Sequence, residues 1–183
     1  MINDFASDYL KTAIKRLKYY KDLGDKTFEQ INERDFHFTP GEESNSIAVI
    51  VQHLWGNMLS RWTNFLTEDG EKSWRKRDEE FEVHDYSKEK ILSLWEEGWS
   101  CFLNTLESLK PEDLGKSVTI REESLTVVDA INRQLAHYPY HVGQIVYLGR
   151  MAKKDGWKSL SIPKGGSLAY NQSAEVKDPA KKY

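Results

Sequence analysis

The sequence has little that would suit a membrane, an oxidising compartment or a nucleic acid. Its single cysteine, Cys101, excludes an intramolecular disulfide and favours a reducing cytosol. No stretch approaches the roughly 18 uncharged apolar residues of a membrane helix, and the first residues show no secretory apolar block. The 26 basic side chains are outnumbered by 29 acidic ones, so no positive field would attract phosphates. We therefore expect a cytoplasmic protein that binds neither a membrane nor a nucleic acid.

The densest group of basic residues lies in a polar stretch between two apolar segments. It comprises Lys72, Arg75, Lys76 and Arg77, and the acidic pair Glu79 and Glu80 follows at once. Because the opposite charges offset each other, the pattern is typical of a solvated loop.

The apolar residues recur at intervals of three and four, and no sustained alternation of the strand type is present. The pattern predicts an all-α fold, with at most a short extended piece at Val118–Arg121. We expect Gly24 to end the first helix and Ser46, Ser87 and Thr126 to cap the later long ones. The predicted helices are Asp4–Leu23, Asp25–Ile31, Ser46–Leu66, Thr126–Ala152, and one that starts at Ser87 and that Pro111 stops.

At 183 residues the chain is long enough for one hydrophobic core. The helical period disappears near residue 155, which divides the chain into a helical body, residues 1–155, and an irregular extension, residues 156–183. Trp157, Leu160 and Tyr170 predict that the first half of the extension packs back on the body, and we expect the last ten residues to be disordered.

Two of the five histidines, His137 and His141, are four residues apart within a predicted helix. At about 100° per residue this spacing places both imidazoles on one face, where they can share a cation. His53 lies at the flank of another predicted helix and can complete a three-imidazole site if the two helices are neighbours. The alternative is that each histidine is simply hydrogen-bonded, as we expect for His37 and His84. Three imidazoles with an open position are typical of catalytic zinc.

The segments Glu42–Leu66 and Arg133–Arg150 resemble the DinB-like (YfiT-like) metalloenzyme superfamily, and more narrowly a bacillary branch of unknown function. The resemblance covers nearly the whole chain and is most specific at His137, Tyr140, His141, Gly143, Gln144 and Ile145. It implies an up-down-down-up four-helix bundle, commonly a homodimer. It also implies one divalent metal ion held by His53, His137 and His141. Zinc is the first choice by ligand type, and nickel, iron and manganese also accept imidazole.

Some members of that superfamily are thiol-dependent enzymes. Our leading hypothesis is therefore that a low-molecular-weight thiol such as bacillithiol binds the metal as a thiolate and attacks an electrophilic small molecule. Asn57 and Arg61, one and two turns after His53, could bind carboxylates of the thiol, or could instead tie helix ends together. Gln134 could orient one of the imidazoles without binding the metal itself. The alternatives are a metal-dependent hydrolase, a non-catalytic metal-binding stress-response module, and a plain helical dimer without metal.

Overall fold

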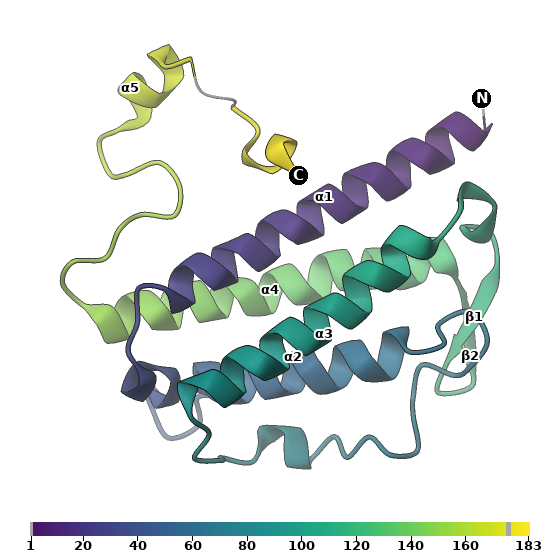
Figure 1. The fold of residues 1–183 in the computed structure, drawn as a ribbon, viewed down its shortest axis with the longest axis horizontal. Helices are drawn as coiled ribbons and strands as arrows, with labels where there is room; N and C mark the ends of the chain where they lie inside the picture. The colour runs from purple at the N-terminus through teal and green to yellow at the C-terminus, as the bar shows by residue number, and fades with distance from the viewer. Residues whose placement is uncertain (1, 175–176) are drawn as a thin grey trace.

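The computed structural model describes residues 2–174 and 177–183, and the fold is mostly helical, as predicted. Four long helices pack around a common core, and a short hairpin joins the third to the fourth (Figure 1). The α-helices are α1 (Ile2–Phe28), α2 (Ile47–Trp62), α3 (Lys88–Ser108), α4 (Val127–Lys153) and α5 (Ser167–Gln172), and the strands are β1 (Ser117–Ile120) and β2 (Glu123–Thr126). Short 3₁₀ turns lie at Glu33–His37, Glu79–Phe81, Pro111–Asp113 and Pro179–Lys182.

The long helices form two parallel pairs that run in opposite directions (Figure 1). In the α2–α3 pair, Trp55 Nε1 donates to Glu97 and Thr105 Oγ1 donates to the Trp62 carbonyl. In the α1–α4 pair, the Tyr9 hydroxyl donates to Asn132 Oδ1 at 2.7 Å. The largest fully buried side chains are aromatic, and they include Trp62, Trp95, Trp99, Tyr138, Phe36 and Phe102.

The predicted starts of three long helices are confirmed at their caps. Ser46 accepts from the N–H of Val49, Ser87 from that of Lys90, and Thr126 from that of Asp129. Each bond satisfies one of the N–H groups that a helix leaves unpaired at its start.

The predicted end of the first helix at Gly24 is wrong, because α1 continues to Phe28. A Cβ at position 24 would overlap the Trp95 ring, so the glycine serves close packing against α3 rather than termination. Asp25, predicted to cap a second short helix, lies inside α1, and its carboxylate accepts from Trp95 Nε1 at 2.7 Å. A tertiary contact thus overrides the local signal.

Helix α2 also differs from its predicted end, since it stops at Trp62 rather than Leu66. Asn64 then adopts a left-handed backbone with φ of 51°, a conformation that asparagine tolerates and that breaks the helix.

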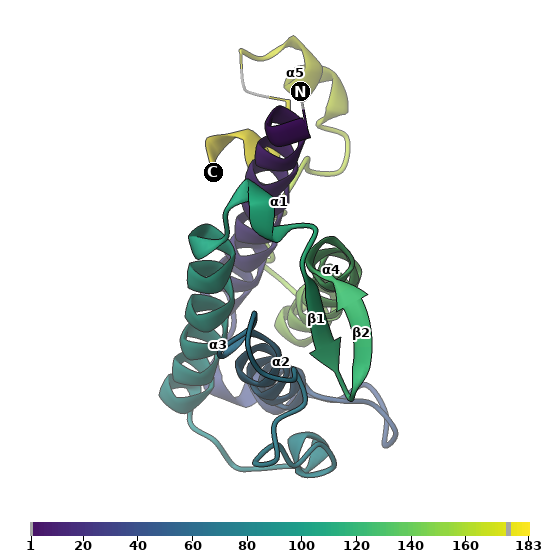
Figure 2. The ribbon, with the colours of Figure 1, turned by 90° about the vertical axis from the view of Figure 1, so that its right-hand side faces the viewer.

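The predicted extended piece is part of a two-stranded antiparallel hairpin that lies beside α4 (Figure 2). Arg121 and Glu122 form its turn with φ of 56° and 65°, and their N–H groups both donate to the Asp69 carboxylate, at 2.9 and 2.8 Å. Two positive φ angles in succession are typical of a type I′ turn. Because the usual Asn-Gly signal is missing and Asp69 is distant in sequence, the second strand was not predicted.

The C-terminal extension contacts α1 and the residues just after it. Gln30 exchanges two hydrogen bonds with the Lys158 backbone, and Arg16 forms an ion pair with Asp178 at 2.6 Å. The division at residue 155 and the disorder of the last ten residues stay predictions, and residues 175–176 lie outside the described part of the chain. None of the described helices is long and apolar enough to cross a membrane.

Candidate metal centre

Helices α2 and α4 bring His53, His137 and His141 together. The Nε2 atom of His137 lies 3.4 Å from that of His53 and 3.1 Å from that of His141. Among the described residues, these three form the only group of three or more histidine, cysteine or acidic side chains that lie close enough to share an ion. The juxtaposition of the three rings inferred from helical spacing is therefore present.

Each of the three imidazoles is held at its other nitrogen by an acceptor. His53 Nδ1 donates to Glu80 Oε2 at 3.0 Å, His137 Nδ1 to Gln134 Oε1 at 3.3 Å, and His141 Nδ1 to Gln144 Oε1 at 2.7 Å. A neutral imidazole that donates from Nδ1 carries a lone pair on Nε2. Three lone pairs thus point at one another with no proton between them.

This arrangement fits a divalent cation. Zinc binds imidazole nitrogen at about 2.0–2.1 Å, and in tetrahedral geometry such donors lie about 3.3 Å apart. The separations of 3.1 and 3.4 Å bracket this value. Without a positive charge, three converging lone pairs would repel each other in a site that excludes much of the water. Three protein donors also leave at least one coordination position for another molecule.

The surroundings of His137 and His141 keep these two imidazoles in the neutral form that binds metal. Burial, together with the neighbouring His141 and His53 rings, lowers the pKa of His137 to about 3. Burial also lowers the pKa of His141. Because protons do not compete for these rings at neutral pH, their Nε2 lone pairs are available there.

Glu80 and Arg75 were expected in a solvated loop, and that expectation is wrong for both. Only 7% of the Glu80 side chain and 1% of the Arg75 side chain is exposed. Arg75 Nε donates to Glu80 Oε1 at 2.6 Å and Nη2 to Oε2 at 2.9 Å. Burial raises the pKa of Glu80, but the bonds from Arg75 and His53 outweigh it and hold the pKa below its ordinary value. Gly56 makes room for this carboxylate, since a Cβ there would overlap it.

Of the three residues that hold the rings at Nδ1, Gln134 is predicted from the sequence to orient an imidazole, whereas Glu80 and Gln144 are not. Gln144 lies three residues after His141, the same spacing as Gln134 before His137, so the helical pattern could have found it. Glu80 is 27 residues from His53 and lies in a 3₁₀ turn, where no periodicity marks it.

Asn57 and Arg61 are buried and have partners within the protein. Asn57 Oδ1 accepts from the Tyr138 hydroxyl at 3.0 Å, and this hydroxyl in turn accepts from Trp62 Nε1 at 3.1 Å. Arg61 Nη1 donates to the Gly70 carbonyl and to Glu71 Oε2. Both residues thus link different parts of the protein, which is the alternative to substrate binding given above. Binding of a substrate by either residue stays a prediction.

The remaining histidines and the cysteine lie outside the cluster. His37 Nε2 contacts the Tyr86 carbonyl at 2.9 Å, and His84 stacks on the Tyr86 ring. Cys101 is partly buried, and burial raises the pKa of its thiol, so it is a weak nucleophile at neutral pH.

A family model described as "Protein of unknown function (DUF1572)" matches residues 4–166. The chain belongs to this family. No curated protein and no solved structure matches it. The segment shared with other DUF1572 proteins includes the three histidines, Glu80 and both glutamines, and it ends just before α5.

Proposed function

We propose that this DUF1572 protein is a metal-dependent enzyme of the DinB-like kind. In this proposal His53, His137 and His141 hold one divalent ion, and a low-molecular-weight thiol is transferred to an electrophilic small molecule. The observation that carries the proposal is the convergence of three Nε2 lone pairs whose rings are fixed from behind by Glu80, Gln134 and Gln144.

The arrangement of the long helices supports the DinB-like part of the proposal. Two parallel pairs running in opposite directions give an up-down-down-up order, and the three histidines come from the second and fourth helices. This is the order that the sequence resemblance implies. The homodimer and the cytoplasmic location stay predictions.

The residues around the centre define what it could do. A divalent ion bound there, zinc by first choice, would favour the thiolate form of a bound thiol. The His137 and His141 imidazoles stay neutral and oriented, and their side chains are only partly buried. Phe81, which stacks on the His53 ring, and Tyr140, beside His141, are 46% and 62% exposed. These two rings offer an apolar rim on which an electrophile could rest.

The thiol must come from outside the protein, since Cys101 does not belong to the cluster. The thiol gives its proton to the solvent, its sulfur forms a bond to an electrophilic carbon, and the bond from that carbon to the leaving group breaks, so that the leaving group departs with the electron pair. We prefer transfer to hydrolysis because both Glu80 oxygens are committed to Arg75 and His53, so this carboxylate is not a free general base.

The test uses untagged, zinc-loaded protein. Bacillithiol and 1-chloro-2,4-dinitrobenzene are added as the two substrates, and their thioether product absorbs light. We expect product above the spontaneous rate only when protein and thiol are both present. His137→Ala should abolish it, and His84→Ala, a histidine outside the cluster, should not. Consumption of the electrophile without thiol would contradict transfer, as would metal-loaded protein inert toward a panel of such electrophiles.

A further inference from the structure

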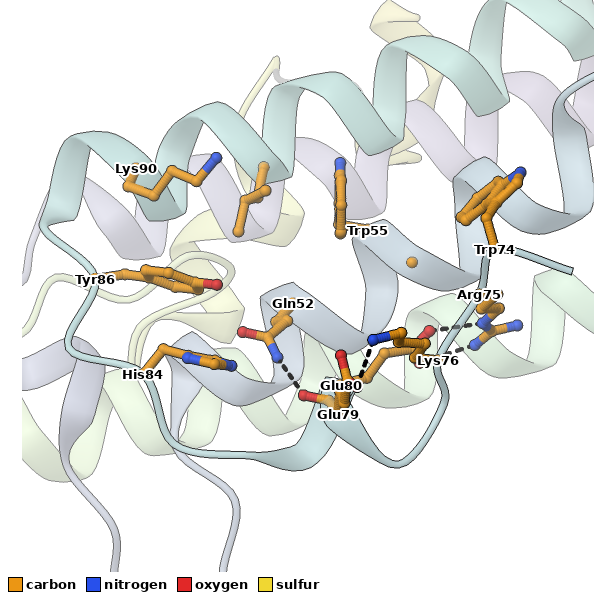
Figure 3. Close-up of a pocket in the computed structure, with 12 residues that line it drawn as sticks. Gln52, Trp55, Trp74, Arg75, Lys76, Glu79, Glu80, His84, Tyr86 and Lys90 are labelled. Carbon is orange, nitrogen blue, oxygen red and sulfur yellow. Dashed lines mark hydrogen bonds and ion pairs between the residues drawn. The ribbon is translucent and has the colours of Figure 1, made fainter. Parts of the chain in front are cut away.

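A pocket of about 320 Å³, distinct from the candidate metal centre, lies beside it (Figure 3). Helix α2 supplies Gln52, Trp55 and Gly56 to its lining, and the beginning of α3 supplies Lys90. Leu94 of α3 also lines the pocket, and the segment between these helices supplies the rest, including Glu80. The pocket contains none of the three histidines, so it is a separate space that shares only the Glu80 wall with the centre.

The walls of this pocket are rich in aromatic rings. Trp55 is fixed by the hydrogen bond from its Nε1 to Glu97 at 2.9 Å. His84 and Tyr86 stack with ring centroids 5.0 Å apart and an interplanar angle of 17°. Trp74, at the other end of the pocket, is 53% exposed, although large aromatic rings are usually covered. These surfaces suit a flat ring as ligand.

The charges of the lining leave one cation uncompensated. Lys76 pairs with Glu79 at 2.9 Å and Arg75 with Glu80, so these four charges cancel. Among the described residues, no acidic side chain pairs with Lys90. In Figure 3 the Lys90 ammonium and the Tyr86 hydroxyl lie at the same end of the pocket, and both point toward its interior. A single cation with a neighbouring hydroxyl suits one carboxylate rather than a phosphate.

We propose that this pocket binds a small aromatic carboxylate. The ring packs against Trp55 and Trp74, and the carboxylate accepts hydrogen bonds from Lys90 and from the Tyr86 hydroxyl. A volume of about 320 Å³ is at the lower end for small-molecule sites, which suits a ligand of one or two rings.

Isothermal titration calorimetry with 2-naphthoate tests the proposal. We expect one saturable site and at least tenfold weaker binding of neutral 2-naphthalenemethanol. Trp74→Ala should weaken naphthoate binding about tenfold, and Lys90→Gln about fivefold. Lys11→Gln is the matched control, because Lys11 is exposed on α1 and should leave the affinity unchanged.

The result does not depend on the metal centre. The same titration in EDTA should give the same affinity, since no histidine of the cluster lines the pocket. Loss of binding in EDTA would place naphthoate on the metal and overturn the proposal. Absence of saturable binding to the wild-type protein, or equal loss in Lys11→Gln and Lys90→Gln, would also overturn it.

Discussion

Replacing Glu80 by glutamine should weaken zinc binding although Glu80 is not a ligand in the proposed site. The carboxylate accepts three N–H groups, two from Arg75 and one from His53 Nδ1 at 3.0 Å. An amide has one oxygen and one NH₂ group, so in either orientation a donor faces a donor at a distance below 3.1 Å. The side chain must shift, and His53 loses part of its orientation and its basicity.

The size of the effect follows from what such supporting contacts are worth. Second-shell partners of metal-bound histidine typically contribute about 10–100-fold in affinity. This range corresponds to about 1.4–2.7 kcal/mol. Because the amide can still offer one acceptor, we expect Glu80→Gln at the lower end, near tenfold.

The assay is competition for zinc with a chromophoric chelator at neutral pH, with circular dichroism to establish that each variant is folded. Glu79→Gln is the matched control, since Glu79 is adjacent but pairs with the exposed Lys76. Gly56→Ala keeps every charge yet displaces the Glu80 carboxylate, and it should weaken zinc binding in the same direction. Folded Glu80→Gln protein that binds zinc as tightly as Glu79→Gln would refute the reasoning.

Four further substitutions test the fold by thermal unfolding. Burial raises the pKa of Asp69, but the backbone N–H groups that it accepts outweigh burial and lower this pKa to about 2. Asp69→Asn should therefore destabilise the protein above pH about 4. The difference in stability from the wild type should disappear as the pH falls toward 2. Gly24→Ala should cost about 1–3 kcal/mol by overlap with Trp95, whereas Gly143→Ala, with open space on α4, should gain about 0.5–1 kcal/mol. Tyr138→Phe should cost about 1–3 kcal/mol, since two buried hydrogen-bond partners lose their bonds.

Local signals were sufficient to predict the helical character and the approximate positions of the long helices. Ser46, Ser87 and Thr126 are caps that act within one turn, so a short window of sequence contains their whole effect. The spacing of His137 and His141 belongs to the same kind of information, and the flank position of His53 followed from the apolar stripe of its helix.

The features that were missed depend on partners distant in the sequence. Gly24 is a helix terminator by local preference, but the Trp95 ring fills the space beside it and α1 continues. The charged stretch around Glu80 and Arg75 has the composition of a solvated loop. Only the contacts of Glu80 with His53 and Gly56 show that it is buried. No window of sequence contains such contacts, and Glu80 is the residue for which this matters most at the site.

The most direct test of the metal centre is elemental analysis of untagged protein after equilibration with zinc, nickel, iron or manganese and removal of free ions. We expect about one divalent ion per chain for the wild type and for His84→Ala, and almost none for His137→Ala. Wild-type protein that retains none of these ions, or His137→Ala protein that retains as much as the wild type, would contradict the proposed three-histidine centre.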